Sequence, residues 1–235
     1  MNTHHVAEVT GTYLTAGWRD TRSPWSSQPT GSFVTLSREA GSGGASLARL
    51  LARRLNSTAD TDVSWRVMEG NITACMLKEN HLPPNIARFL PEDRIPEIDA
   101  SIGEFVGLHP SLWELVQKTN ETTRELARRG HVILVGRGAN FATAGMSGGL
   151  HVRLVAPVAF RARYLAQLYN ISEAEALARN AKCDAARRRY VRTNFNAEVA
   201  DPTAYDLVIN VARVPLVEAA KLIATHLAQR VPATA

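Results

Sequence analysis

The stretch Phe33–Ala48 combines the residue types and the spacing of a loop that binds phosphate. An apolar run, FVTL, leads into a glycine-rich segment, and the leucine spacing after it predicts an amphipathic helix that ends near Leu55. Glycines accept positive φ angles, and the first turn of a helix offers unpaired N–H groups and the positive end of the helix dipole. These groups predict a phosphate cradle made of Gly41, Ser42, Gly43, Gly44, Ala45 and Ser46.

The loop lacks the lysine of the usual pattern G-x-x-x-x-G-K-[ST]. If Gly43 fills the sixth place, Gly44 stands where the lysine belongs. If Gly44 fills it, Ala45 stands there, and Ser46 offers the hydroxyl that would bind Mg²⁺. Arg38 is the nearest cation in the sequence. A glycine-rich turn that only joins a strand to a helix explains the spacing equally well, so the loop alone leaves both interpretations open.

The elements that must position this loop are those of a parallel α/β sheet. Apolar runs predict strands near residues 32–37, 63–67, 131–135, 150–155 and 206–211. Helices are predicted near residues 111–129, 157–169, 172–180, 183–195 and 215–230. Because such sheets bind ligands at the carboxyl ends of their strands, we expect the loop, Arg137 and Arg213 to converge there. Residues 1–30, rich in Ser, Thr, Gly and Pro, are interpreted as a flexible leader, and residues 31–235 as a single domain.

A second group of residues with chemical potential lies in residues 179–192, RNAKCDAARRRYVR. As a helix, this segment would carry cations around most of its surface, and crowded cations need a counter-anion or solvent. A mobile lid with arginines can supply the charge that phosphoryl transfer requires while it excludes water. A solvated basic helix is the alternative, in which Asp184 and Arg187 form only a surface pair.

Composition limits the function classes further. The net charge is +5, and only Lys78, Lys118, Lys182 and Lys221 are lysines, so arginine, which suits bidentate contacts to phosphate, dominates the cations. We find no nucleic-acid motif, no apolar segment long enough to span a membrane and no secretory signal. The two cysteines lie far apart without metal-ligand spacing, which favours a reduced, cytoplasmic setting. The glycine-rich loop makes small nucleotides the expected partners. Whether the chain forms a homo-oligomer stays open.

Several motifs together resemble the cytidylate kinase-like family of P-loop kinases. They are SREAGSGG, VGRGAN, HVRLVAP, the D-x-x-R of the arginine-rich segment and DPTAYDLVINVAR, in this order. The similarity extends over about residues 31–230. It implies a P-loop fold with a five-stranded parallel sheet flanked by helices, an ATP site with Mg²⁺ at the loop, and a helical lid at about residues 172–196.

The resemblance also implies roles for individual residues. The loop residues 41–46 would cradle the ATP phosphates, and Arg137 would hold the phosphate of the acceptor nucleotide. Asp184 and Arg187 match the lid pair at the acceptor nucleoside, and Arg161 matches an arginine common at the start of the helix after VAP. Arg38, Arg187 and Arg188 are the candidate catalytic cations, since the lysine is absent.

Two departures from the family pattern keep three functions in view. Gly138 stands where cytidylate kinases have an aspartate that helps to read cytosine, and Ala45 and Ser46 replace an arginine and a glutamate. The first hypothesis is an ATP-dependent kinase for a nucleoside monophosphate, with CMP or dCMP favoured. The alternatives are a nucleotide-binding regulatory protein with little or no kinase activity, and a kinase for another small acceptor.

Overall fold

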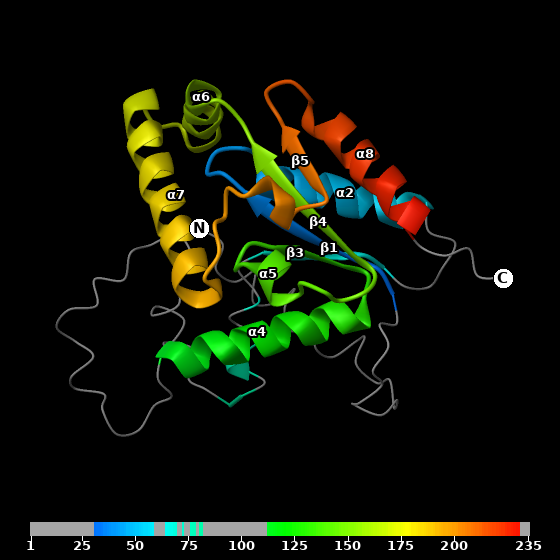
Figure 1. The fold of residues 1–235 in the computed structure, drawn as a ribbon. Helices are drawn as coiled ribbons and strands as arrows, with labels where there is room; N and C mark the ends of the chain where they lie inside the picture. Colours follow the sequence, from blue (N-terminus) through cyan, green and yellow to red (C-terminus); the bar gives the residue numbers. More distant parts are fainter. Residues whose placement is uncertain are drawn as a thin grey trace.

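The computed structural model describes residues 31–58, 64–69, 72, 76–78, 80–81 and 112–230. Its centre is a sheet of five parallel strands in the order β2-β3-β1-β4-β5 (Figure 1). The strands are β1 (Phe33–Arg38), β2 (Arg66–Glu69), β3 (Val132–Val135), β4 (Gly149–Val155) and β5 (Leu207–Asn210). Because β1 pairs with both β3 and β4, its carboxyl end, where the glycine loop begins, lies in the middle of the sheet edge.

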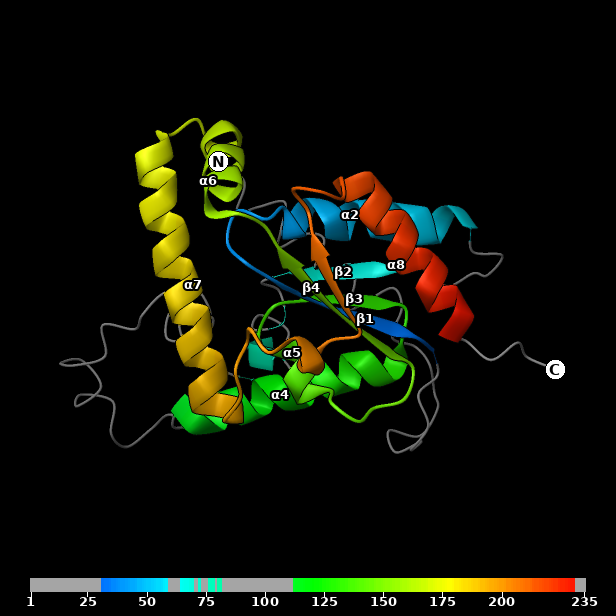
Figure 2. The same cartoon turned by 45° about the horizontal axis from the view of Figure 1, so that its top comes forward.

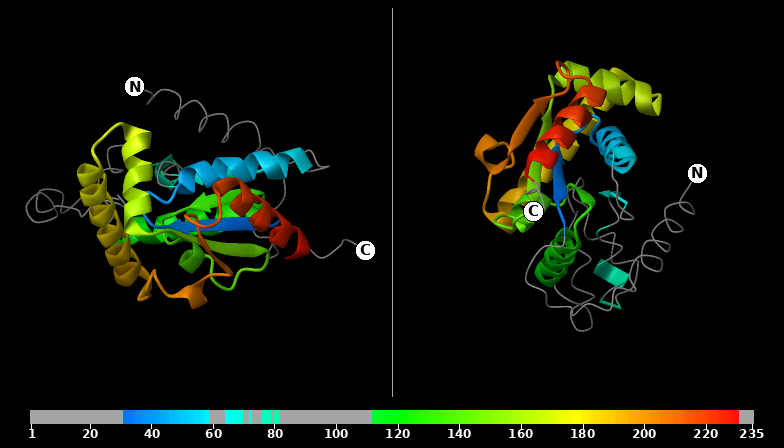
Figure 3. Two further views of the ribbon diagram at one scale, coloured as in Figure 1. Left: turned by 90° about the horizontal axis from the view of Figure 1, so that it is seen from above. Right: turned by 90° about the vertical axis from the view of Figure 1, so that its right-hand side faces the viewer.

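Helices cover both faces of the sheet. α2 (Gly44–Thr58) packs beside α8 (Leu216–Arg230) over one face, and α4 (Leu112–Arg129) with the short α5 (Ala139–Ala142) lies over the other (Figures 2 and 3). Along β1, Val34 and Leu36 point into the core under α2 and α8, while Phe33 joins a second core with Leu126 of α4. This alternation gives an apolar strand that is buried on both faces, as a parallel sheet requires.

Two antiparallel helices stand beside the carboxyl end of the sheet: α6 (Val158–Tyr169) and α7 (Glu173–Phe195) (Figure 1). Small side chains let them pack closely, since Ala162 and Ala166 of α6 meet Ala176 of α7. Asn170 makes the turn in the left-handed region at φ 53°. Ser172 then caps α7 by accepting a hydrogen bond from the Glu175 N–H at 3.1 Å.

The predicted strands are confirmed at β1, β3, β4 and β5, with small differences at their ends. The strand predicted at residues 63–67 instead spans Arg66–Glu69. The cause lies in Asn56 at the end of α2. Its side chain accepts from the Trp65 N–H at 2.6 Å and donates to the Trp65 carbonyl at 3.1 Å, so this residue is tied to the helix before the strand begins.

The prediction of two helices at 172–180 and 183–195 is wrong, because α7 is continuous. No glycine or proline separates the two segments, and Asn180, taken as a helix end, is buried within the helix. The short helix α5 was not predicted. A 3₁₀ turn (Pro202–Ala204) precedes β5. The leader assigned to residues 1–30 lies outside the described residues. Among the described helices, none combines the length and apolar character that a membrane span needs.

Candidate functional site

The glycine loop has the backbone geometry of an anion cradle. Gly41 and Gly43 adopt φ angles of 77° and 78°, and α2 begins directly afterwards at Gly44. The first backbone bond of this helix runs from the Leu47 N–H to the Gly43 carbonyl, so the amides of its first turn keep no acceptor within the helix. The loop therefore presents successive N–H groups at a helix N-terminus, as a phosphate site requires.

Arg38 takes the space beside Gly44. A Cβ atom added to Gly44 would lie 2.9 Å from Cγ of Arg38 and 3.3 Å from its Cβ and Cδ. The last residue of β1 thus covers the backbone position where, in one register, the phosphate-loop lysine belongs. The aliphatic stem of a basic side chain from the strand before the loop thus occupies this space, and Arg38 also lines the cleft.

A cleft of about 480 Å³ opens over the loop. This volume lies within the range of small-ligand sites. Its floor is the backbone of residues 40–46, and its walls come from β1, β2, α2, α6 and α7. Side chains at its edge include Arg38, Arg49, Glu69, Tyr164, Leu168, Tyr169, Arg179, Asn180, Cys183 and Arg187. The lining thus combines polar and basic groups with aromatic and aliphatic ones, and Arg179 lies 4.6 Å from the centroid of the Tyr169 ring. A ligand with both phosphates and a ring finds partners for each part in such a cleft.

The residues present fit ATP, and they fit Mg²⁺ only as an ion shared with a nucleotide. The Ser46 hydroxyl lies 3.0 Å from the Tyr164 hydroxyl, which places it on the cleft side of α2. Within the described part of the chain, no group of three or more His, Cys, Asp or Glu side chains could hold a metal. Mg²⁺ is commonly held by one or two carboxylates together with substrate phosphates, and the carboxylates that line this cleft are Glu39 and Glu69.

Arg161 is buried and joins the loop to α6 and α7. Its guanidinium donates to the carbonyls of Ala156 and Ala40 at 3.0 and 2.8 Å, and to the Asp184 carboxylate at 2.8 Å. Glu39 approaches the same guanidinium at 3.3 Å. Asp184 also accepts from the Ala40 N–H at 2.7 Å. Arg161 and Asp184, assigned to the acceptor by resemblance, thus lie together in a buried network that fixes α6 and α7 to the loop.

Arg187 and Arg188, predicted as catalytic cations, point in different directions. Arg187 donates to the Arg38 carbonyl at 3.3 Å, lies 4.0 Å from Asp184 and lines the cleft. Arg188 is exposed on the next position of α7 and lines neither the cleft nor the smaller cavity described below. The structure therefore brings Arg187, but not Arg188, to the loop.

Arg137 lies in a sharp turn between β3 and α5. Gly136, Arg137 and Gly138 take φ angles of 81°, 59° and 62°, three successive residues in the left-handed region. A non-glycine residue held there is strained, and such strain is concentrated at functional sites. Arg137 is half-buried and is not among the described residues that line the cleft. It follows β3, beside the end of β1, as the topology argument predicted.

Gly138 has no room for a side chain. A Cβ atom added there would lie 2.4 Å from Cε2 of Phe195 at the end of α7. Phe195 in turn stacks on Phe141, with ring centroids 5.6 Å apart. An aspartate, the residue that cytidylate kinases have at this position, would collide with this aromatic pair.

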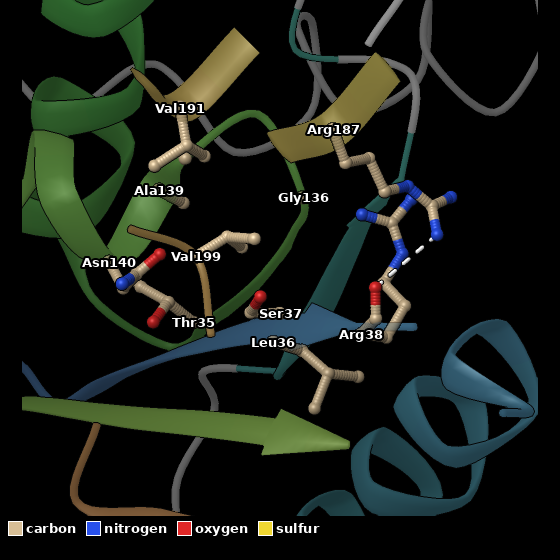
Figure 4. Close-up of a pocket in the computed structure, with 11 residues that line it drawn as sticks. Thr35, Leu36, Ser37, Arg38, Gly136, Ala139, Asn140, Arg187, Val191 and Val199 are labelled. Atoms are coloured by element: carbon tan, nitrogen blue, oxygen red, sulfur yellow. Dashed lines mark hydrogen bonds between the residues drawn. The ribbon is translucent and has the colours of Figure 1, made fainter. Parts of the chain in front are cut away.

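A narrow second cavity continues from the loop toward this turn (Figure 4). Thr35, Ser37 and Arg38 of β1 form one wall, and Asn140 of α5 and Arg187 of α7 lie opposite. Arg187 and Arg38 stand at one end, joined by the hydrogen bond drawn in the figure. Arg187 lines both cavities, so it stands between the loop and the turn that carries Arg137.

Three residues of this site were missed by sequence reasoning: Tyr164, Asn180 and Phe195. A signal for Asn180 was present, because positions 180, 184 and 187 share one face of a helix. It was hidden by the prediction that a helix ends at Asn180. No signal could have identified Tyr164 or Phe195, whose contacts to the loop and to Gly138 join residues far apart in the sequence.

Three solved structures are distantly similar to this chain. A solved structure of an uncharacterized protein from Eubacterium ventriosum is similar, with a TM-score of 0.62 and 18% identity over 85% of this chain and 99% of that one. A gluconokinase from Sinorhizobium meliloti gives a TM-score of 0.47 and 16% identity, over 86% of this chain and 94% of that one. A shikimate kinase from Acinetobacter baumannii in complex with shikimate gives a TM-score of 0.46 and 13% identity, over 86% of this chain and 97% of that one.

The search of curated proteins gives no match. The model of the cytidylate kinase-like family, however, matches residues 33–213, which include the loop, the turn at Arg137 and α7. The resemblance stated from the motifs is confirmed, and with it the P-loop kinase fold of a parallel sheet flanked by helices. The chain belongs to the cytidylate kinase-like family.

Proposed function

We propose that this protein transfers a phosphoryl group from Mg-ATP to a nucleoside monophosphate, with CMP or dCMP favoured. The observation that carries the proposal is the arrangement around Gly44. The loop amides face a cleft, and the Arg38 side chain lies where a phosphate-loop lysine would begin. A nucleotide phosphate at this position would meet a cation, even though the sequence pattern lacks one.

Bound ATP would supply the transferable phosphoryl group, and Mg²⁺ would neutralise part of its charge. The loop N–H groups hold phosphate oxygens, with the Ser46 hydroxyl directed to the same cleft. Arg38 and Arg187 add charge where negative charge develops on the transferred oxygens. The network of Arg161 and Asp184 holds α6 and α7 against the loop, which positions these cations and excludes water. Arg137, at the adjacent turn, is the proposed contact to the acceptor phosphate.

Gly138 favours a second candidate, a kinase for another small acceptor. Phe195 fills the space that a side chain at position 138 would need. An aspartate at this position, which would read cytosine, would need Phe195 to shift. An acceptor that needs no carboxylate contact at this point fits the turn as well as CMP does.

The test is release of ADP with Mg-ATP across CMP, dCMP, UMP, AMP and GMP. Turnover on CMP or dCMP supports the first proposal, and turnover only with an acceptor outside this set supports the second. ATP binding without turnover on any acceptor would support a regulatory nucleotide-binding protein. Arg137→Ala is expected to weaken acceptor affinity, and unchanged affinity would contradict the assignment. Arg187→Ala should lower turnover because Arg187 lines the cleft, whereas the matched variant Arg188→Ala should not, because Arg188 is exposed.

A further inference from the structure

Asn180 is a buried polar side chain without a partner. It lies in the middle of α7 with 2% of its surface exposed, and neither its Oδ1 nor its Nδ2 atom makes a hydrogen bond. On the same helix, by contrast, Asn194 donates to the Tyr190 carbonyl at 2.8 Å. Among the described residues, Asn120 is the other asparagine with a buried unpaired atom, its Oδ1. A buried carboxamide with no partner is unfavourable, so native structures keep few of them.

The carboxamide lies against the first glycine of the loop. Its Nδ2 atom would be 2.8 Å from a Cβ atom added to Gly41. It also belongs to the wall of the cleft, together with the backbone of residues 40–46. The unpaired group therefore lies beside the loop, between Gly41 and the backbone of α6, at the wall of the cleft and not in the apolar core.

A neighbouring residue on the same face of α7 holds Asn180 in place relative to the loop. Asp184, one turn further along the helix, is held by the Ala40 N–H and by the Arg161 guanidinium at 2.7 and 2.8 Å. Arg161 also donates to the Ala40 carbonyl, so the chain just before Gly41 is bonded to this network through both backbone groups. A side chain on so constrained a helix is preorganised for a ligand, which lowers the entropic cost of binding.

We propose that the Nδ2 group of Asn180 donates a hydrogen bond to a phosphate oxygen of the nucleotide bound at the loop. This inference rests on the proposed function, because it needs a phosphate there. A carboxamide is suited to this contact: its N–H groups donate, and an ionised phosphate only accepts. Because the group is neutral, it adds direction to phosphate binding without adding to the charge of Arg38 and Arg187.

The experiment measures binding of ATP and of inorganic tripolyphosphate to the full chain by calorimetry, and the Tm of the ligand-free protein. Asn180→Leu keeps a similar shape without polar atoms, and Asn180→Ala is a second variant should leucine disturb folding. We expect each to weaken both ligands by about tenfold, the value of one hydrogen bond to a charged group. The ligand-free Tm should stay equal or rise, because an unpaired buried amide is removed. Asn194→Ala is the matched control and should leave binding unchanged.

Each other outcome is decisive. Unchanged binding by Asn180→Leu and Asn180→Ala, with a lowered Tm, would show that Asn180 only packs α7, and the inference would be wrong. Loss of ATP binding with normal tripolyphosphate binding would assign the amide to the nucleoside and overturn the phosphate contact. If the unsubstituted protein binds neither ligand, the proposed function fails together with this inference; if it binds both and the variants bind equally well, only this inference fails.

Discussion

Arg38 is the residue on which the proposed chemistry depends most directly, because its side chain covers Gly44. We expect Arg38→Ala to lower the rate of ADP release by about 10²–10³-fold, the usual effect of removing one group that stabilises transition-state charge. Arg38→Lys should recover part of this rate, since a cation is restored without the planar guanidinium. Arg53, an exposed arginine of α2, is the control, and its alanine variant should be unchanged. Full activity of Arg38→Ala would contradict the role.

The packing of the turn at Gly138 can be tested through the stability of the protein. Alanine at this position must take φ 62° and also place its Cβ atom 2.4 Å from the Phe195 ring. Gly145 is the matched control: its φ is 80°, but nothing lies within 4 Å of an added Cβ. We expect Gly145→Ala to cost about 1–2 kcal/mol in the free energy of unfolding.

Gly138→Ala should cost about 1–3 kcal/mol more than this control, because an overpacked contact is added to the same backbone penalty. Urea unfolding of the two variants measures the difference. Equal costs would mean that Phe195 moves aside easily, and an aspartate at position 138 would then become acceptable to the turn.

At the scale of elements, α7 is held to the rest of the molecule by a buried ion pair. Asp184→Asn keeps the shape of the side chain but removes the charge that faces Arg161. Glu39 remains 3.3 Å from the Arg161 guanidinium, so the buried charge keeps one of its two carboxylates. We therefore expect a loss of about 2–4 kcal/mol in unfolding free energy, below the full cost of an unpaired buried charge. Amide exchange over Glu173–Phe195 should also become faster, since the helix loses its main tie to the loop. Glu198→Gln breaks an exposed pair with Arg192 and should cost less than about 1 kcal/mol. Equal effects of the two variants would contradict this account.

The elements also show which parts of the fold follow from local sequence. The central strands were predicted because buried parallel strands are continuous apolar runs, as in VILV of β3. The loop and the arginine segment were found because glycine and charge patterns are local. The extent of α7 and the start of β2 were not, because they depend on the burial of Asn180 within a continuous helix and on Asn56 binding Trp65. The blocked space at Gly138 was also hidden, since Phe195 is 57 residues away by numbering (195 − 138).

At the scale of the whole molecule, two histidines make stability depend on pH from a region away from the loop. Burial lowers the pKa of His131, which precedes β3 and contacts the Trp65 ring. Burial also lowers the pKa of His151 in β4; Asp206 opposes this shift and Arg230 adds to it. The His151 ring lies 2.8 Å from the Thr35 hydroxyl, near the amino end of the central strands, whereas the glycine loop follows their carboxyl end.

The sign of the pH effect follows from these lowered pKa values. Well above pH 6.5 both histidines are neutral in the folded and the unfolded chain, so they add no pH dependence there. As the pH falls through 6.5, the histidines are protonated in the unfolded chain but stay neutral in the folded chain, because their folded-state pKa values are lower. The unfolding free energy therefore falls with the pH, by at most about 1.4 kcal/mol per pH unit for each histidine. Urea unfolding at about pH 7.5 and pH 5.5 should show this loss, because the two values lie on either side of the usual histidine pKa.

His131→Asn and His151→Gln should each remove part of this loss, and the double variant should remove most of it. Asparagine is chosen at position 131 because the backbone there has φ 51°, which asparagine tolerates. Asp206 does not produce the same signal. Burial raises the pKa of Asp206, but hydrogen bonds from the His151 backbone N–H and from Arg230 lower it by more, so the net pKa lies below 3.8. Its contribution to stability is therefore lost only at more acidic pH. A protein whose stability is the same at pH 7.5 and pH 5.5 would show that these rings are charged without cost in the folded state, which their burial argues against.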